Sequence, residues 1–353
     1  MTGILITAMV ILIFIVLYQV GQASELSAIL KEEERTNKTR NTWMAWTFLL
    51  TFPLLMFFFW YVHVSMMPQM LPESASDHGI EYEFMFKWTL IITGIVFVIT
   101  QFALFYFGFK YRASDNRSAF FFAHSNKLEI IWTSVPAVAM AILVAIGLKN
   151  WFVMTGDAPA KHQTVEVIGK QFNWIMRYPG PDGKLGKRDY RLTSDANNVL
   201  GLDWNDPATH DDIIANELHL VKGTPVELVI GSRDVIHDVG LPHFRMKMDA
   251  VPGVMTRMWF TPIISTEEMK VKTNNPNFVY EISCDQMCGR GHYSMKGTVI
   301  VHDTADYATW AAGQKSYYSQ NAPGAKPAEA APAEGADKAP ADSAKKMAMN
   351  IKK

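Results

Sequence analysis

Four long stretches that are almost free of charged side chains constrain the fold of this 353-residue chain more than any other feature. A helix of roughly 20 apolar residues is long enough to cross the hydrocarbon core of a bilayer. Pro53 and Pro136 fall inside two of these stretches, and membrane helices tolerate proline because neighbouring groups satisfy the freed carbonyls. The sequence therefore predicts a multi-pass membrane protein with helices over residues 3–20, 43–64, 88–109 and 130–148.

A cleaved signal peptide is the alternative interpretation of the first stretch. Signal peptides normally begin with a positively charged region, and residues 1–6 contain neither Lys nor Arg. We therefore expect a retained helix whose N-terminus lies outside the cell.

Basic residues are distributed unevenly among the predicted loops. The loop between the first two helices and the loop between the last two each contain four Lys or Arg residues. Residues 68–86, between the second and third helices, contain none. Because basic loops stay on the cytoplasmic side, we expect everything after residue 148 to lie on the outer face.

The pattern changes from helical to extended after about residue 161. Short apolar or alternating runs at residues 164–168, 225–230, 277–283 and 297–303 are typical of strands, and turn-forming residues separate them. These runs predict an all-β sandwich over residues 161–305. Ala, Pro and Lys dominate residues 320–353, which predicts a disordered tail. The net charge of −1, without a basic aromatic cluster, argues against a nucleic-acid partner.

The chain has two cysteines, Cys284 and Cys288, and both lie in the predicted loop before the last strand. His292 and Met295 lie in the same loop, and His237 follows an earlier strand. Sulfur and imidazole ligands suit copper. A local disulfide and a tetrahedral zinc site are the alternatives. Met295 favours copper over zinc, because a thioether is a poor ligand for zinc.

Four segments together resemble cytochrome c oxidase subunit II. The run Cys-x-x-x-Cys-Gly-x-x-His-x-x-Met at residues 284–295 resembles the copper-binding loop of that family. Residues 234–253 resemble its stretch around the first histidine ligand, and residues 169–174 resemble its aromatic segment. Residues 129–136 resemble the start of its second membrane helix. The resemblance covers about residues 88–303 and implies a helical anchor followed by a Greek-key, cupredoxin-like sandwich.

The resemblance also implies a dinuclear copper centre of the CuA type. Both cysteines would bridge two copper ions, each ion would take one histidine, and a weak axial ligand would complete each ion. The implied ligands are His237, Cys284, the carbonyl of Gln286, Cys288, His292 and Met295. Such a subunit accepts electrons from a c-type cytochrome and passes them to subunit I. There, oxygen is reduced to water and protons are translocated. The sequence has no Cys-x-x-Cys-His, so we expect no c-type heme in this chain.

Two positions, Gln286 and Phe172, depart from the family pattern, and the roles of Trp174 and Glu129 are inferred only from the family positions that they match. Gln286 stands where the family usually has a magnesium-binding Glu, which puts a magnesium site at the border with subunit I in doubt. Phe172 stands at the electron-accepting Trp of the family, and Trp174 is retained; core packing is the alternative for both. Glu129 matches a carboxylate at the mouth of a proton-uptake route, although Glu is also common at a helix start.

The family typically has two membrane helices, which here correspond to residues 86–150 and would pack on subunit I. Residues 1–66 would add two helices that serve either anchorage or contact with another subunit. The resemblance implies a bacterial inner membrane, lipid, other oxidase subunits and a c-type cytochrome as surroundings and partners. A supercomplex with a quinol:cytochrome c reductase is a further candidate.

Three other classes share part of this pattern. A quinol oxidase subunit II lacks the copper ligands, and nitrous oxide reductase is a much longer soluble chain. A membrane-tethered copper chaperone would explain the loop but not residues 129–136.

Overall fold

The computed structural model describes the chain except for residues 1, 31–33, 68–69, 115–117, 119 and 324–353. The chain divides into two compact units, which are described separately below. One unit contains Met1–Met70 and Trp88–Ala137, and the other contains Leu71–Lys87 and Val138–Lys353.

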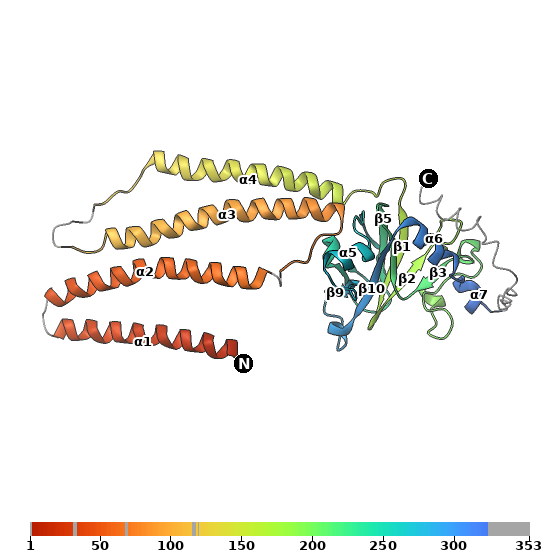
Figure 1. The fold of residues 1–353 in the computed structure, drawn as a ribbon, viewed down its shortest axis with the longest axis horizontal. Helices are drawn as coiled ribbons and strands as arrows, with labels where there is room; N and C mark the ends of the chain where they lie inside the picture. The colour runs from red at the N-terminus through yellow and green to blue at the C-terminus, as the bar shows by residue number, and fades with distance from the viewer. Residues whose placement is uncertain (1, 31–33, 68–69, 115–117, 119, 324–353) are drawn as a thin grey trace. The chain divides into compact units, whose positions relative to one another are not determined.

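Four long helices occupy the N-terminal half of the chain, in agreement with the predicted membrane segments. They are α1 (Thr2–Leu30), α2 (Glu34–Met66), α3 (Asp77–Lys110) and α4 (Asn126–Met154), as Figure 1 shows. The last three contain apolar spans long enough to cross a bilayer. Among the residues whose side chains are described, α1 has a shorter apolar segment, Ile11–Ser27. The crossing at residues 3–20 therefore stays a prediction.

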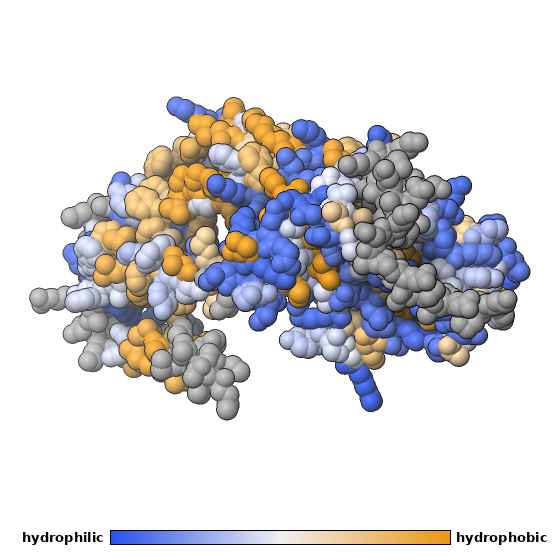
Figure 2. Space-filling model, turned by 45° about the vertical axis from the view of Figure 1, so that its right-hand side comes forward, coloured by the Kyte–Doolittle hydropathy of each residue, from blue (hydrophilic) through white to orange (hydrophobic). Residues whose placement is uncertain are grey.

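Aromatic side chains connect α2 to α3. The ring centroids of Phe48 and Phe105 are 4.4 Å apart, and those of Trp46 and Phe109 are 4.6 Å apart. Gly108 allows this approach, because a Cβ atom there would lie 2.7 Å from the Phe48 ring. Most other apolar side chains of the helices are exposed, and Figure 2 shows hydrophobic residues gathered over them. An apolar outer surface of this kind suits a lipid environment.

The C-terminal half contains a sandwich of two five-stranded sheets. The first sheet has the strand order β3 (Ile213–Ala215), β2 (Asn173–Tyr178), β1 (Gln163–Lys170), β5 (Val226–Ser232), β8 (Thr256–Phe260). The second has the order β4 (Leu218–Val221), β10 (Lys296–His302), β9 (Tyr280–Cys284), β6 (His237–Leu241), β7 (Met246–Ala250). The pairs β1–β5 and β10–β4 are parallel, and the other pairs are antiparallel. The predicted combination of a membrane anchor and an all-β sandwich is confirmed.

Three short helices accompany the sandwich: α5 (Thr266–Lys272), α6 (Thr304–Ala312) and α7 (Tyr317–Asn321). The predicted tail at 320–353 thus begins inside α7, and residues 324–353 lie outside the described part of the chain.

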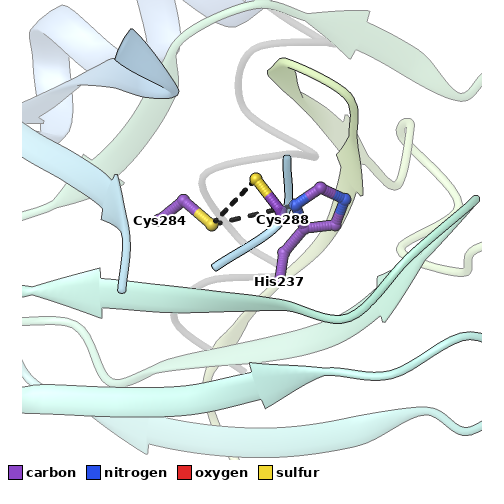
Figure 3. Close-up of side chains that lie close together, drawn as sticks. All are labelled: His237, Cys284 and Cys288. Carbon is purple, nitrogen blue, oxygen red and sulfur yellow. Dashed lines mark hydrogen bonds between the residues drawn. The ribbon is translucent and has the colours of Figure 1, made fainter. Parts of the chain in front are cut away.

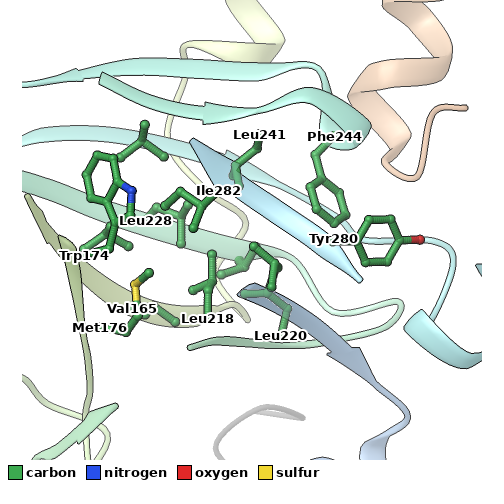
Figure 4. Close-up of a cluster of buried hydrophobic side chains, with 14 of the residues drawn as sticks. Val165, Trp174, Met176, Leu218, Leu220, Leu228, Leu241, Phe244, Tyr280 and Ile282 are labelled. Atoms are coloured by element: carbon green, nitrogen blue, oxygen red, sulfur yellow. The ribbon is translucent and has the colours of Figure 1, made fainter. Parts of the chain in front are cut away.

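Alternate side chains of the strands fill the space between the two sheets (Figure 4). Val165 from β1 and Leu228 from β5 face Leu218 from β4 and Ile282 from β9, and all four are buried. The same continuous core includes Cys284, Cys288 and Met295. One end of the hydrophobic core is therefore built from side chains that can bind a metal.

A buried cluster of charges fixes the long connection between β2 and β3. Arg177, which is 1% exposed, donates hydrogen bonds to Glu166, Asp212 and the carbonyl of Gly186. Arg188 forms a second ion pair with Glu166, at 2.9 Å. Burial raises the pKa of Asp212 to about 6, although the nearby Arg177 guanidinium acts in the opposite direction. These paired charges attach the connection to the first sheet.

The segment before α3 belongs to the sandwich unit. Ala75 donates its backbone N–H to the carbonyl of His243 and accepts a hydrogen bond from the N–H of Ile263. The Ser76 hydroxyl donates to the carbonyl of Phe244 over 2.6 Å. The residues just before α3 are therefore joined to the sandwich by hydrogen bonds.

Candidate metal centre

The candidate ligands come from two neighbouring strands and the loop that follows one of them. His237 is the first residue of β6, and Cys284 is the last residue of β9. The two strands pair with Val239 opposite Cys284, which places both side chains at the same end of the sheet. The loop between β9 and β10 carries the remaining candidates, Gln286, Cys288, His292 and Met295.

The structure brings all six predicted ligand groups together. The Sγ atoms of Cys284 and Cys288 are 3.7 Å apart, and Cys284 Sγ is 3.7 Å from His237 Nδ1 (Figure 3). Cys288 Sγ lies 3.8 Å from both His292 Nδ1 and Met295 Sδ. The carbonyl oxygen of Gln286 is 3.2 Å from Cys284 Sγ.

The two cysteines are free, so the alternative of a local disulfide does not describe this structure. A disulfide requires sulfur atoms about 2.05 Å apart, whereas these are separated by 3.7 Å. His237, Cys284 and Cys288 are also all buried, with ligand atoms within 4.8 Å of one another. This arrangement leaves space for a metal between the side chains.

The chemistry of the donor set fits copper. Thiol, imidazole and thioether groups are the soft and intermediate ligands that copper prefers. Burial and the neighbouring Cys284 side chain raise the pKa of the Cys288 thiol to about 11. A buried thiolate is thus unfavourable without a cation beside it, and metal binding must release the proton.

Comparisons with known proteins agree with this chemistry. The family model for the transmembrane domain of cytochrome c oxidase subunit II matches residues 64–150. The model for the periplasmic domain of the same subunit matches residues 163–303. The alternative cytochrome c oxidase subunit 2 of Bradyrhizobium diazoefficiens is 37% identical over 232 residues, which are 65% of this chain and 78% of that protein. The chain belongs to the cytochrome c oxidase subunit II family.

Two further comparisons show lower sequence identity to this subunit II. Cytochrome c oxidase subunit 2 of Cereibacter sphaeroides is 27% identical over 252 residues, covering 67% of this chain and 77% of that protein. Among solved structures, the periplasmic domain of a Bradyrhizobium japonicum cytochrome oxidase subunit II is 22% identical with a TM-score of 0.30. That match covers 45% of this chain and 94% of the domain.

Hydrogen bonds behind the ligands orient His237 in this subunit II. Its Nε2 atom lies 2.8 Å from Asp234 Oδ1, and the other carboxylate oxygen accepts from the backbone N–H of Gln171. Burial opposes ionisation of Asp234, but the hydrogen bonds from Gln171 and His237 outweigh it and lower the pKa. An ionised Asp234 accepts a hydrogen bond from the Nε2–H group, which leaves the lone pair of Nδ1 directed toward Cys284.

Gln171 also holds the ligand loop, a contact that the sequence did not reveal. Its side-chain Nε2 donates to the carbonyl of Cys288 over 2.5 Å. Gln171 lies within the aromatic segment at 169–174, but nothing in the sequence indicates that this segment reaches the loop. The turn between β1 and β2 therefore connects both halves of the candidate centre.

The two aromatic residues of this segment have different surroundings. Phe172 is 39% exposed and packs on the ligand loop, since a Cβ atom at Gly291 would lie 2.5 Å from its ring. Trp174 is 2% exposed and lies in the core, with its ring centroid 6.0 Å from that of His237. Phe172 can thus contact a partner surface, whereas Trp174 contacts a ligand from inside.

Glu129, the predicted proton-uptake residue, lies in the first turn of α4. Its side chain is exposed, and its backbone N–H donates to the carbonyl of Ser125 over 2.9 Å. Glu129 belongs to the compact unit that contains most of the helices.

Proposed function

We propose that this subunit II receives single electrons from a c-type cytochrome at a dinuclear copper centre and delivers them to oxidase subunit I. Reduction of oxygen to water and proton translocation take place in subunit I. The observation that carries the proposal is the convergence of six ligand groups around two sulfur atoms 3.7 Å apart. Family membership supports the same role.

Each candidate ligand has a distinct part in holding the metal. Cys284 and Cys288 would supply a thiolate each to a pair of copper ions, and His237 and His292 would contribute one imidazole each. Met295 and the carbonyl of Gln286 complete the set. Copper bound here supplies one-electron redox chemistry at a potential that its surroundings tune.

The protein holds the ligands in place and excludes water from four of them. His237 and Met295 are fully buried, and Cys284 and Cys288 are at most 6% exposed. Gln171 and Asp234 fix the loop and the imidazole, so the ligand positions need to change little when an electron arrives or leaves. Phe172 covers part of the loop and would lie against the docked cytochrome.

We do not propose a magnesium site at the border with subunit I. Gln286 contributes a carbonyl to the cluster, but its side chain lacks the carboxylate with which the family binds that ion. A hard cation prefers carboxylate oxygens.

We also infer the membrane arrangement from the basic loops and the family. The sandwich would lie on the outer face of a bacterial inner membrane, with a helical hairpin at 86–150 packed on subunit I. The two preceding helices, within residues 1–66, would anchor the chain or contact another subunit.

A copper count with an electron paramagnetic resonance spectrum tests the central proposal. We expect the full-length chain, reduced and then loaded with copper, to hold two ions per chain that share one unpaired electron. One copper ion, a zinc ion or a disulfide between Cys284 and Cys288 would contradict it. Heme that co-purifies with the chain would separate an oxidase subunit from a copper chaperone.

Glu129 is proposed to pass protons to subunit I from the cytoplasmic side. An ionisable group at a membrane boundary is suited to that task. Glu129→Gln should slow oxygen consumption by the assembled oxidase while the spectrum of the copper centre stays the same. Unchanged turnover would remove Glu129 from the route.

A further inference from the structure

A cavity lies on the outer side of the first sheet and is separate from the metal ligands. Its volume is about 700 Å³, within the range of sites for small molecules. Its walls come from β1, the end of β5, the β7–β8 turn and the long connection between β2 and β3. The candidate metal ligands are not among its lining residues.

The cavity has two cationic side chains and no acidic one among its lining residues. Arg188 lines one wall and Arg233 another. Each arginine pairs with a carboxylate that is not among the lining residues: Arg188 with Glu166, and Arg233 with Asp195. The space between the walls is therefore suited to an anion.

Arg188 forms an ion pair with a buried carboxylate, and its other contact is with a weak hydrogen-bond acceptor on the cavity wall. Its Nε lies 2.9 Å from Glu166, a carboxylate that is 4% exposed and is also bound by Arg177. Its Nη2 donates toward the sulfur of Met255, 2.7 Å away on the cavity wall. A thioether is a weak acceptor, so an oxyanion would replace it favourably.

The rest of the lining is apolar or neutral. Ile168 and Leu200 are buried, and Val199, Val251 and Pro252 extend the apolar wall. Thr193 and Ser232 add hydroxyl groups. An inorganic ion would use the guanidinium groups but leave this apolar surface wet, whereas an anion with an apolar body would cover it.

We propose that this cavity binds a small amphiphilic anion, an oxyanion group attached to a short apolar body. The oxyanion lies between Arg188 and Arg233, and the apolar body lies against Ile168, Val199 and Leu200. The site is independent of copper, because its lining residues include none of the proposed ligands.

Titration of the full-length chain in phosphatidylcholine nanodiscs with hexanoate tests the proposal. Binding is measured by saturation-transfer difference NMR and calorimetry, with empty nanodiscs subtracted to remove partition into lipid. We expect saturable binding, with 1-hexanol and inorganic phosphate each binding at least roughly tenfold more weakly because each lacks one half of the ligand. Equal binding of hexanol or of phosphate would overturn the proposed chemistry, and so would the absence of saturable hexanoate binding.

Arginine variants locate the binding. Arg233→Gln should weaken hexanoate binding by roughly tenfold, as loss of a charged hydrogen bond does. Arg257→Gln is the matched control, because Arg257 is an arginine of the same sheet that is 67% exposed and lies outside the cavity. Equal weakening in both variants would show attraction to general surface charge and overturn the site. Arg188→Gln gives a second measurement, and Arg233→Gln decides alone if that variant fails to fold.

Discussion

The sandwich buries two polar clusters that differ in how their polar groups are paired. Around Arg177, each charge meets an opposite charge: the guanidinium contacts Glu166 and Asp212, and Arg188 completes the cluster. Around Cys284, by contrast, the contacting atoms are sulfur, ring nitrogen and carbonyl oxygen, most of which offer lone pairs.

The difference separates a structural cluster from a ligand site. Buried charges that are paired are satisfied within the protein, and removing one partner leaves an uncompensated charge. Buried lone pairs that converge on one point lack a cation, and a metal supplies it. Mutation of the two clusters should therefore change different properties. Mutation of the Arg177 cluster should lower the free energy of unfolding, and mutation of the Cys284 cluster should lower the metal content.

Removing one sulfur from the candidate centre should have the largest effect. Cys288→Ser replaces the sulfur that contacts Cys284, His292 and Met295 with a hard hydroxyl. We expect copper affinity to fall by more than the roughly 10–100-fold typical for loss of a hydrogen-bond partner behind a ligand. Metal analysis of the purified chain measures the copper content.

The control for Cys288→Ser is Ser294→Ala, in the same loop but with an exposed hydroxyl that bonds only the Gly291 carbonyl among the described contacts. Two copper ions per chain in Cys288→Ser would show that Cys288 is not a ligand.

Removing the central charge of the other cluster should change stability instead. Arg177→Met leaves Glu166 and Asp212 buried without their shared cation, which should lower the free energy of unfolding by about 3–5 kcal/mol. Thermal and denaturant unfolding followed by circular dichroism measure this change. The copper content of the folded fraction should stay the same.

Arg257→Met is the control for that measurement, because Arg257, unlike Arg177, is 67% exposed in its ion pair with Glu227. Exposed pairs contribute about 0–1 kcal/mol. Equal losses in the two variants would mean that burial of the Arg177 cluster has no special consequence.

A residue that touches the metal loop without being a ligand should have an intermediate effect. Gln171→Ala removes the hydrogen bond to the carbonyl of Cys288 but leaves the backbone bond to Asp234. Copper affinity should fall roughly 10–100-fold, with little change in unfolding. Asn173→Ala, an exposed change two residues away, is the control. Affinity equal to that of the control would exclude Gln171 from the support of the loop.

The two clusters also differ in how far the sequence predicts them. Four candidate side chains of the metal centre lie within residues 284–295, so spacing and ligand type pointed to copper before the fold was known. Arg177 and Asp212 are 35 positions apart, and Gln171 and Cys288 are 117 apart. Ordinary charged and amide residues at such separations give no local signal. Pairing of β2 with β3 brings Arg177 close to Asp212, and packing of one sheet on the other brings Gln171 close to Cys288.

The membrane helices show a similar limit. Hydropathy located the apolar spans, yet α2 begins at Glu34, well before the predicted start at residue 43. Polar residues continue the helical hydrogen bonding beyond the apolar part. Hydropathy therefore indicates where a helix is apolar rather than where it ends.

A pair formed by the buried His219 and the half-buried His302 sharpens the comparison, because its nitrogen atoms converge as ligands do. His219 Nδ1 lies 2.8 Å from His302 Nε2, a distance at which the N–H of one ring donates a hydrogen bond to the other ring. Burial, followed by the neighbouring His302, lowers the pKa of His219 to about 4. The two facing nitrogen atoms thus satisfy each other through one hydrogen bond, and we expect the pair to bind no copper.

This pair should instead make stability depend on pH. The folded chain resists protonation of His219, whereas an unfolded histidine takes up a proton near pH 6.5. The contribution is present above pH 6.5 and is lost as the pH falls toward 4, by at most about 1.4 kcal/mol per pH unit. Asp212, whose pKa is raised to about 6, acts in the opposite direction over much of this range.

Comparison of His219→Gln with the unmodified chain isolates the histidine, because the effect of Asp212 is common to both. The glutamine side chain can still bond His302 but does not titrate. The difference in unfolding free energy between the two chains should therefore shift in favour of His219→Gln as the pH falls from 6.5 to 4. Parallel pH profiles of unfolding free energy would show that His219 titrates normally. A separate measurement of copper content tests the expectation that the pair binds no metal. If Cys288→Ser retained copper and the double variant Cys288→Ser, His219→Gln lost it, the histidine pair would be a ligand site.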